Sequence, residues 1–500
     1  MIGAGHAGLV SAIHLAGAGI EVEVLEHARR PGGATRSSER TLPGFVHDDH
    51  AAFVPMTVAS PAMQELELER DGLEWLRPDV VMAHPFDDGS ALTLHRDVEA
   101  TCASLGPAGP GWRETMDQLV PVADTLTKAV VSPLPPVGRG IGLAAALRRD
   151  GLDWARRMLG SIEALGLEVF GGDERATAWI AGCAQHSGLP PTTAGSGAFG
   201  LLLALLGHSH GWPIPRGGMG AVVSALVARA EREGASIRCD ASVQRILTRD
   251  SRVIGVRLAS GEEVAADAVI STVSAGPLSR MVDPDAIGLR AHKRLAGWRY
   301  GTGAFKLDYA LSGPVQWTAA QAREASVVHV AGELTELQAA AQAGERGVVP
   351  EHPALVVGQQ SLYDHSRAPE GRQTLYVYAH VPGRYEMDDD EITGRMEAQL
   401  ERFAPGFGGL VLERAQRAPW QTERENPSLV GGDIAGGSME LDQQLLFRPS
   451  PGMCRYRAPL RGLYLAGGST HPGGAVHGMS GRGAARALLA DRRTRPWRRV

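Results

Sequence analysis

A glycine-rich turn at the start of the chain constrains the fold more than any other feature. Residues 2–8 read IGAGHAG, which contains the spacing G-x-G-x-x-G. Residues 9–18 then carry the apolar periodicity of a helix, and residues 21–25 read as a strand that ends at Glu26. Such glycines before a helix, followed about 20 positions later by an acidic residue, are typical of a dinucleotide-binding unit. We therefore expect a Rossmann-like α/β domain.

Each residue of this turn has a physical role in the expected unit. Gly3 and Gly5 allow the backbone to approach a pyrophosphate, and Gly8 allows the helix to pack on the strand. The amino end of the helix faces the phosphate charge. Glu26 is placed to accept hydrogen bonds from a ribose 2′-hydroxyl, which disfavours a 2′-phosphorylated cofactor.

The first strand of this unit is expected to be largely missing. Only Met1 and Ile2 precede Gly3, whereas a strand normally has five or six residues. We expect the natural start to lie upstream, and we expect weaker cofactor binding if the chain begins here.

A second glycine pair follows in Pro31-Gly32-Gly33. Its distance from Glu26 fits a loop that passes close to the dinucleotide, with Arg36 available to a phosphate. An ordinary Pro-Gly-Gly turn is the alternative.

The middle of the chain supplies a unit that would complete the nucleotide sheet. Residues 211–220 (GWPIPRGGMG) precede an alanine-rich helical pattern at 221–233. Val243 would lie where backbone groups can hold an adenine. Four short strands are expected at residues 236–240, 243–248, 253–258 and 267–271.

Residues 462–481 form the most informative stretch of the chain. A buried strand (LYLAG) leads into a glycine-rich loop and then into a helix over about 480–489. The amino end of that helix can stabilise the negative charge that develops on a reduced flavin ring. Gly473 and Gly474 allow backbone N–H groups to reach ring carbonyls. Gly467 and Val476 are expected as further cofactor contacts in this loop.

Size and composition set limits on the remaining possibilities. Five hundred residues exceed one hydrophobic core, so we expect two joined domains. A net charge of −6 argues against a nucleic-acid partner. The four cysteines include no C-x-x-C pair, which favours a reducing, cytoplasmic compartment. The longest apolar run, residues 197–206, is too short to span a membrane and reads as a buried helix.

Together these segments resemble the phytoene desaturase and carotenoid oxidoreductase family of flavoproteins, most closely the branch of pyridine nucleotide-disulfide oxidoreductase domain-containing protein 2. The resemblance extends over nearly the whole chain. It is carried by IGAGHAGLVSA from Ile2, PGGAT from Pro31, AQHSGLP from Ala184, GWPIPRGGMG from Gly211, DHSRAPEG from Asp364, ERFAPGF from Glu401, NPSLVGGDIAGGS from Asn426 and THPGGAVHG from Thr470. Two residues depart from the family pattern: Ala34 replaces a frequent arginine, and Gly468 replaces a frequent aspartate.

The resemblance implies FAD as the cofactor and a discontinuous FAD-binding domain of the glutathione-reductase type. This domain would comprise residues 1–60, 211–281 and 455–500. An interleaved α+β substrate domain would comprise residues 61–210 and 282–454. The substrate domain would shape a long apolar cavity over the flavin.

The activity implied is desaturation or dehydrogenation at carbon–carbon bonds of an apolar, carotenoid-like substrate, with hydride transfer to flavin N5. A carotenoid ketolase or isomerase and an amine oxidase stay open as alternatives. A non-catalytic binding protein of the GDP dissociation inhibitor type is the alternative of another class. Residues 138–142 and 431–438 lack the strand–turn–helix setting of a second Rossmann site. We therefore expect oxygen or a quinone as the electron acceptor.

Three residues are candidates for catalysis. Lys306 lies in an apolar strand at residues 303–311, and in related amine oxidases a strand lysine holds a water near flavin N5. The alternative is a lysine on the outer surface of the sheet. His471 and His477 flank the glycine loop and could contact flavin or substrate, with hydrogen bonding to the loop backbone as the alternative. His186 is a further candidate for the cavity wall.

Two polar segments carry weaker signals. Residues 47–50 (HDDH) resemble a metal cluster, but alternation along a strand would send their side chains to opposite faces, so no metal site is expected. The last ten residues contain five arginines. Such a tail could touch an anionic membrane peripherally, and a solvated tail is the alternative. The oligomeric state is left open by these patterns.

Overall fold

A small parallel sheet forms the centre of the part of the molecule that carries the N-terminal glycine turn. The computed structural model describes residues 1–134 and 151–494. Strand β1 (Glu23–Leu25) pairs with β8 (Ser236–Arg238), and β12 (Val269–Ser271) pairs with β18 (Leu463–Leu465), both in parallel. Ile2 joins the two pairs, because it bridges Leu25 on one side and Ser271 on the other. The expected first strand is therefore represented by this single residue.

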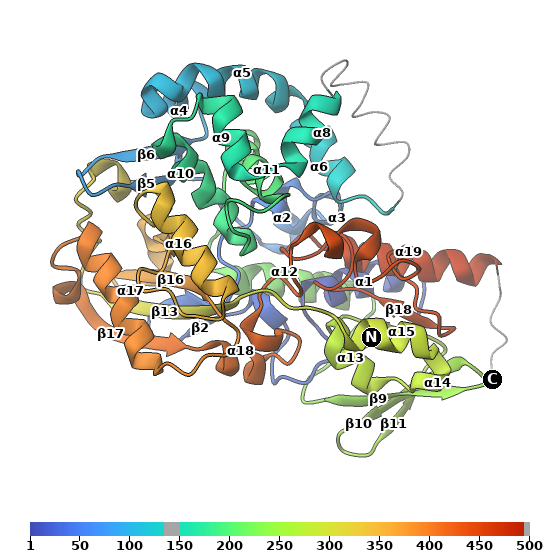
Figure 1. Cartoon of the computed structure of the whole chain (residues 1–500). Coiled ribbons are helices and arrows are strands. Elements are labelled where there is room, and N and C mark those ends of the chain that lie inside the picture. Colours follow the sequence, from blue (N-terminus) through green and yellow to red (C-terminus); the bar gives the residue numbers. More distant parts are fainter. Residues whose placement is uncertain (135–150, 495–500) are drawn as a thin grey trace.

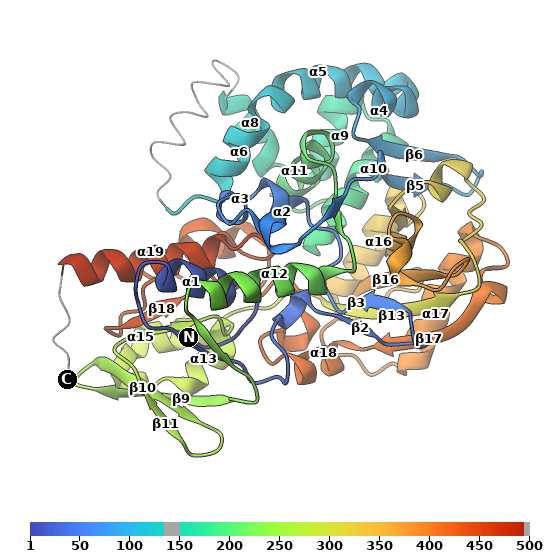
Figure 2. The same cartoon turned by 180° about the vertical axis from the view of Figure 1, so that it is seen from behind.

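Three helices cover the parallel sheet. They are α1 (His6–Ala16), α12 (Met219–Arg232) and α19 (Met479–Thr494), and α1 contacts both of the others. Their apolar side chains share one core with the sheet residues Val24, Ile270 and Tyr464. Seen from behind, α12 and α1 run side by side in front of the sheet (Figure 2). The helices expected at residues 9–18, 221–233 and 480–489 are confirmed, with α19 extending further than expected.

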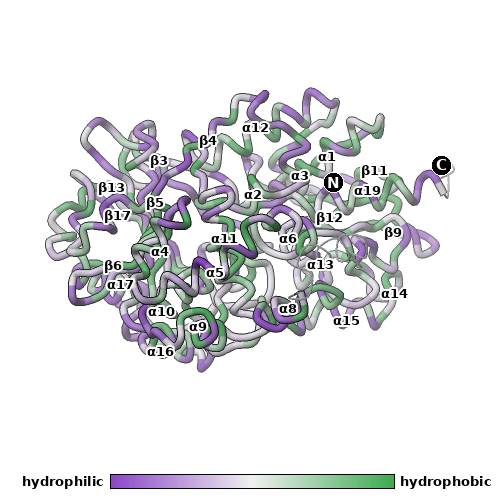
Figure 3. The backbone as a smooth tube through the Cα atoms, turned by 90° about the horizontal axis from the view of Figure 1, so that it is seen from above, coloured by the Kyte–Doolittle hydropathy of each residue, from purple (hydrophilic) through white to green (hydrophobic). Residues whose placement is uncertain are grey.

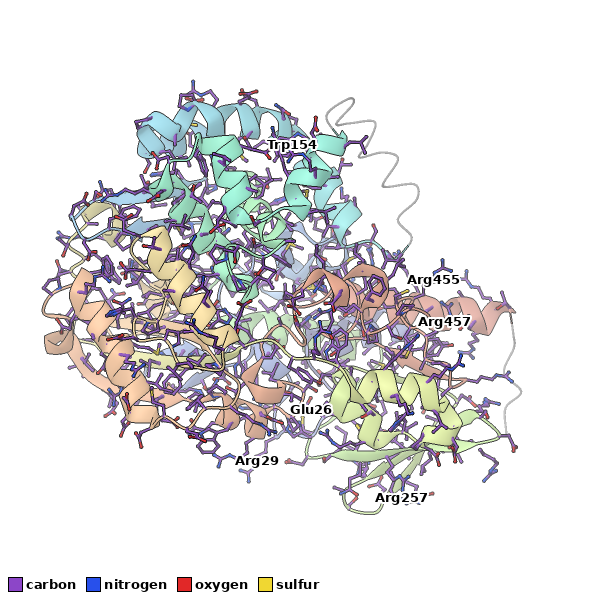
Figure 4. All side chains as sticks on the ribbon, viewed as in Figure 1. Glu26, Arg29, Trp154, Arg257, Arg455 and Arg457 are labelled. Carbon is purple, nitrogen blue, oxygen red and sulfur yellow. The ribbon has the colours of Figure 1, made fainter. Side chains whose placement is uncertain are left out.

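An antiparallel meander extends from this part of the molecule. It consists of β9 (Val243–Arg249), β10 (Arg252–Leu258) and β11 (Glu263–Ala265), in the order β11–β10–β9. In Figure 4, Arg257, on the central strand of the meander, lies at the bottom of the molecule, whereas Glu26 lies nearer its middle. The chain returns from the meander through β12, as the strand pattern predicts.

The other part of the molecule is built on a larger mixed sheet. Its order is β17–β13–β16–β15–β14–β5–β6. The bounds are β5 (Val80–Pro85), β6 (Ala91–His95), β13 (Gly303–Leu311), β14 (Val327–Val330), β15 (Leu355–Gly358), β16 (Gln373–Val381) and β17 (Val411–Arg417). Strand β13 has the predicted bounds and lies between β16 and β17, and every one of its residues is buried because both faces of the sheet are covered.

The two faces of this sheet pack against different layers. Leu375, Val377 and Ala379 of β16 share a core with α17 (Asp389–Phe403), whereas Tyr376 and Tyr378 face the opposite side. On that side lies a helical layer, which Figure 1 shows above the sheet. It contains α4 (Val98–Leu105), α5 (Gly109–Leu119), α6 (Ala123–Val130), α8 (Gly151–Leu159), α9 (Ile162–Phe170), α10 (Glu174–Ala184) and α11 (Ser196–Ser209). Because successive side chains of β16 point to opposite faces of the sheet, they contribute to two separate hydrophobic cores.

Apolar helices are concentrated in this upper layer. Figure 3 shows hydrophobic stretches of the tube at α9 and α11. The apolar run at residues 197–206 lies within α11, as expected of a buried helix. In the part of the chain that the structure describes, no helix is long and apolar enough to cross a membrane.

Candidate active site

A cavity of about 890 Å³ extends from the parallel sheet to the large sheet. This volume lies at the upper end of the range for ligand pockets. Eleven of the residues expected to bind cofactor or act in catalysis line it: Gly3, Gly5, Glu26, Gly33, Arg36, Val243, Gly467, Gly474, Val476, His471 and His477. Gly8, Gly32, Gly473 and Lys306 are not among the lining residues.

The N-terminal loop has the geometry of a phosphate cradle. Gly3 has a φ of +92°, a conformation that side-chain-bearing residues rarely adopt. Gly5 precedes α1, and no side chain caps the first N–H groups of that helix. A Cβ on Gly8 would lie 2.0 Å from the carbonyl oxygen of Gly3. The loop therefore keeps its shape only with glycine at position 8, and the bare helix end suits a pyrophosphate.

Glu26 has a second role that the sequence pattern did not reveal. Its carboxylate accepts hydrogen bonds from the backbone N–H groups of Ala4 (2.7 Å) and Ala28 (2.9 Å) and lies 2.9 Å from His27 Nδ1. Burial alone would raise the pKa of Glu26, but the hydrogen bonds from His27, Ala28 and Ala4 outweigh it and lower the pKa. The ionised carboxylate both lines the cavity and ties the glycine loop to the end of β1.

The second glycine loop lies directly against the first. The N–H of Gly32 donates to the carbonyl of Ala4 (2.8 Å), and the N–H of Ala51 donates to the carbonyl of Ala34 (3.1 Å). Arg36 lines the cavity with its Nε 3.6 Å from a carboxylate oxygen of Asp49. This arrangement favours a loop against the dinucleotide over an isolated turn.

A segment whose first glycines lack the setting of a Rossmann site closes the cavity on the other side. Residues 433–448, here called the strap, are held by Arg448, which is fully buried and donates to the carbonyls of Ala435 (2.9 Å), Ser438 (3.1 Å) and Gly468 (2.9 Å). Burial lowers the pKa of Arg448 to about 10. A Cβ on Gly468 would lie 3.2 Å from the carbonyl oxygen of Ala435. The glycine that departs from the family pattern thus makes room for the strap.

His471 and His477 are both neutral and bound to backbone. The Nδ1 of His477 accepts from the N–H of Met479 (3.0 Å), so Nε2 carries the proton and donates to the carbonyl of Gly473 (3.1 Å). Burial lowers the pKa of His477 to about 3 and also lowers that of His471. Nε2 of His471 lies 2.7 Å from the carbonyl of Ser132. These contacts favour a role in shaping the loop, while both rings still border the cavity.

Lys306 is buried, so its alternative placement on the outer surface of the sheet is wrong. Only 3% of the residue is exposed, and Nζ donates to the carboxylate of Asp308 and lies 4.4 Å from the centre of the Tyr376 ring. Tyr376 in turn donates to the carbonyl of His50 (2.5 Å). Because His50 and Tyr376 line the cavity and Lys306 does not, the lysine lies one layer behind the cavity wall.

The acidic residues of the 47–50 segment are engaged in ion pairs. Asp48 pairs with Arg367 (2.6 Å), and Asp49 pairs with Arg40 (2.9 Å). No group of three metal-ligating side chains occurs within the described ranges 1–134 and 151–494. Residues 138–142 lie outside the described residues. Residues 431–438 begin in a 3-10 turn, Val430–Gly432, and continue as the first part of the strap.

Two glycine loops and a bare helix end around an elongated cavity define a flavin-dependent oxidoreductase. The chain belongs to the flavin containing amine oxidoreductase family, whose model matches residues 6–489. It is thus a FAD-dependent oxidoreductase, and its resemblance to carotenoid-type flavoproteins is confirmed by its relatives.

The relatives extend over nearly the whole chain. Pyridine nucleotide-disulfide oxidoreductase domain-containing protein 2 from Rattus norvegicus is 29% identical, over 98% of this chain and 93% of its own length. A zeta-carotene-forming phytoene desaturase from Myxococcus xanthus is 29% identical, over 95% of this chain and 90% of its own length. Cyclohexylamine oxidase from Brevibacterium oxydans shares the fold, with a TM-score of 0.60, 16% identity and 98% coverage of both chains.

Proposed function

We propose that this FAD-dependent oxidoreductase removes hydrogen from a carbon–carbon bond of a long apolar substrate, as a desaturase or dehydrogenase. The observation that supports this proposal is the apolar wall of the cavity beyond the glycine loops. Its residues come from the helical layer and the strap: Val131, Met158, Phe199, Leu202, Leu203, Trp212 and Ile434. Such a wall binds hydrocarbon through dispersion and desolvation and keeps water from the reacting bond.

The residues present fit FAD in one orientation. The amino end of α1 with Gly3 and Gly5 would hold the pyrophosphate, Glu26 the ribose and Val243 the adenine. Gly474 and Val476, just before α19, would contact the flavin ring. When bound, FAD supplies the hydride acceptor. We also propose residues 1–60, 211–281 and 455–500 as the FAD-binding domain and residues 61–210 and 282–454 as the substrate domain.

The charges of the cavity favour a hydrocarbon over an amine. Its two lining carboxylates, among the described residues, are Glu26 and Glu425. Glu26 is bonded to the glycine loop, and Glu425 pairs with Arg40 (2.9 Å). A substrate ammonium in the apolar part would find no free counter-charge there, and an unpaired buried charge is costly. A ketolase or isomerase on the same scaffold differs in product rather than in cavity chemistry.

Anaerobic flavin reduction tests this proposal. Purified protein loaded with FAD is mixed with polyene or terpene hydrocarbons, or with aliphatic and aromatic amines, and the flavin absorbance is followed. We expect the hydrocarbons to bleach the flavin and to yield products with one more double bond. Bleaching by amines alone would contradict the proposal, and an oxygenated or merely isomerised product would favour the ketolase or isomerase. We also propose oxygen or a quinone as the electron acceptor. The rates at which oxygen and a quinone reoxidise the reduced flavin, measured in the same cuvette, show which of the two it is.

We further propose peripheral contact with a lipid surface, in the cytoplasm, at the mouth of the cavity. Leu159, Leu441 and Leu445 line the cavity and are also 55%, 40% and 53% exposed. Leu159 and Leu441 are neighbours, because the N–H of Gly195 donates to the carbonyl of Leu159 (2.9 Å) and the side chain of Leu441 packs on Gly195. Leu445 begins the 3-10 turn that follows the turn of Leu441. Co-sedimentation with lipid vesicles should fall in a Leu441→Ser, Leu445→Ser variant and stay unchanged in Leu412→Ser, a leucine of β17.

A further inference from the structure

The end of the cavity nearest the large sheet is polar rather than apolar. His186, just after α10, lies with its ring centre 5.5 Å from Trp212 and 5.1 Å from His329. Tyr378 of β16 faces it from the sheet. His186, Trp212 and Tyr378 line the cavity, and His329 lies fully buried behind them.

Hydrogen bonds join these rings into a chain. The hydroxyl of Tyr378 lies 3.2 Å from Nδ1 of His186, and Nε2 of His186 lies 3.0 Å from Nε2 of His329. Nδ1 of His329 turns toward Gly182, where a Cβ would lie 2.5 Å from it and 3.1 Å from Nδ1 of His84. Both of these Nδ1 atoms are buried with no hydrogen-bond partner within the described ranges. Nε2 of His84 lies 2.7 Å from the carbonyl of Gly332.

The hydroxyl of Tyr378 is the polar group at this end with bonding capacity to spare. The hydroxyl of Tyr376 donates to His50, and the indole of Trp212 donates to the carbonyl of Leu203 (3.0 Å). The hydroxyl of Ser187 donates to the carbonyl of Ala184 (2.7 Å). A phenol both donates and accepts, and Tyr378 uses only its contact with His186 in the described part of the chain.

The chain of rings can be polarised in either direction. If Nε2 of His186 donates to His329, Nδ1 of His186 accepts a hydrogen bond from the O–H of Tyr378, whose oxygen can then accept a hydrogen bond from a ligand. If His329 donates instead, Nδ1 of His186 donates to Tyr378, whose O–H is then free to donate to a ligand. Burial lowers the pKa of His186 to about 3 and that of His329 well below its usual range, and it raises the pKa of Tyr378. All three groups stay neutral in both arrangements.

We propose that this end of the cavity binds a neutral oxygen function, a hydroxyl or a carbonyl, carried by one end of an otherwise apolar substrate. The inference rests on the proposed function and narrows its substrate class. Because the Tyr378 hydroxyl can either donate or accept a hydrogen bond, it can bind an alcohol as well as an aldehyde or ketone. A carboxylate or an ammonium would bring a charge into a neutral, buried site without a counter-charge. Tyr378 thus determines the preference for substrates that carry a neutral oxygen function at one end.

Equilibrium binding to the FAD-loaded protein tests this inference. The probes share one carbon skeleton: geranylgeraniol, geranylgeranial, geranylgeranoic acid and the corresponding hydrocarbon, titrated at neutral pH while tryptophan fluorescence is recorded. We expect the alcohol and the aldehyde to bind about fivefold more tightly than the hydrocarbon, as one added hydrogen bond implies. The acid should bind no more tightly than the hydrocarbon.

The variant Tyr378→Phe separates recognition from folding. It should bind the hydrocarbon as the unaltered protein does and lose the preference for alcohol and aldehyde, with its FAD content unchanged. Tyr385→Phe is the matched control, since Tyr385 donates to Asp389 (2.7 Å) outside the cavity, and it should keep the preference. Equal binding of alcohol and hydrocarbon, or a preference that survives in Tyr378→Phe, overturns the inference and leaves the proposed function intact. Failure of every apolar probe to reduce the flavin would instead overturn the proposed function, while the binding preference would still be measured.

Discussion

Gly8 shows how one missing methyl group shapes the cofactor loop. It lies inside α1, where alanine is ordinarily more favourable than glycine by about 1 kcal/mol. A Cβ there would come within 2.0 Å of the Gly3 carbonyl oxygen, so the loop would have to move. We expect Gly8→Ala to lower the free energy of unfolding by about 1–3 kcal/mol and FAD affinity by about tenfold.

Urea unfolding and flavin absorbance per chain measure the two effects of Gly8→Ala. Gly394→Ala is the control, because Gly394 also lies inside a helix, α17, and a Cβ there meets no atom within 4 Å. It should stabilise the fold by up to about 1 kcal/mol and leave FAD binding unchanged. Equal FAD content in the two variants would contradict the close approach to Gly3.

Lys306 and Asp308 form a buried pair whose role two variants can separate. Burial lowers the pKa of Lys306 and raises that of Asp308, and the attraction between the two groups opposes both shifts. Lys306→Met removes the ammonium beside the buried carboxylate of Asp308, which should lower the free energy of unfolding by about 3–5 kcal/mol. Lys306→Met with Asp308→Leu should recover most of that loss.

The rate of flavin reduction in this double variant decides what Lys306 does. We expect the rate to be retained, because the lysine lies behind the cavity wall. A slow rate in a double variant of normal stability and FAD content would show instead that Lys306 acts on the flavin, as the amine oxidase resemblance implied. Stopped-flow absorbance under anaerobic conditions measures it.

At the scale of elements, the strap depends on one buried guanidinium. Arg448 donates to four carbonyls in and around the strap, and lysine, with one compact ammonium, cannot reach them all. Arg448→Lys should therefore lower the free energy of unfolding by roughly 2–4 kcal/mol and release FAD more readily, because the strap packs on Gly468. Thermal unfolding with and without added FAD measures both effects. The exposed Arg461→Lys serves as control, and similar behaviour of the two variants would contradict this role.

Elements defined by local patterns could be predicted from the sequence, whereas contacts between distant segments could not. The glycine loop, α1 and β13 follow from spacing and apolar runs within about ten residues. The strap has no such local signal, because its glycines lack a neighbouring strand and helix, and only the fold brings Ala435 onto Gly468. The polar end of the cavity is a stronger case. His84, His186, His329 and Tyr378 come from four separate elements. His186, within AQHSGLP, is the one of the four that the sequence indicates as a cavity residue, and the other three have no recognisable local motif.

The whole molecule buries many histidines in the neutral state. Burial lowers the pKa of His50 and His84 to about 4 and that of His47 and His477 to about 3. In the unfolded chain each would titrate near 6.5. Between these values the unfolded chain binds more protons than the folded one, so stability falls as the pH falls from 6.5 toward 4.

Each such histidine should cost about 2 kcal/mol between pH 7 and pH 5, and total stabilities are only about 5–15 kcal/mol. We therefore expect the urea midpoint to drop steeply below pH 6.5, with more than one proton taken up on unfolding. His84→Gln should lower the number of protons taken up on unfolding by about one, and so make the dependence of the midpoint on pH less steep. His352→Gln, at an exposed histidine, should leave it unchanged. A midpoint that stays constant from pH 7 to pH 5 would mean that these rings are already protonated in the fold, or that water reaches them. Either finding would contradict the neutral state on which the reversible contact of Tyr378 depends.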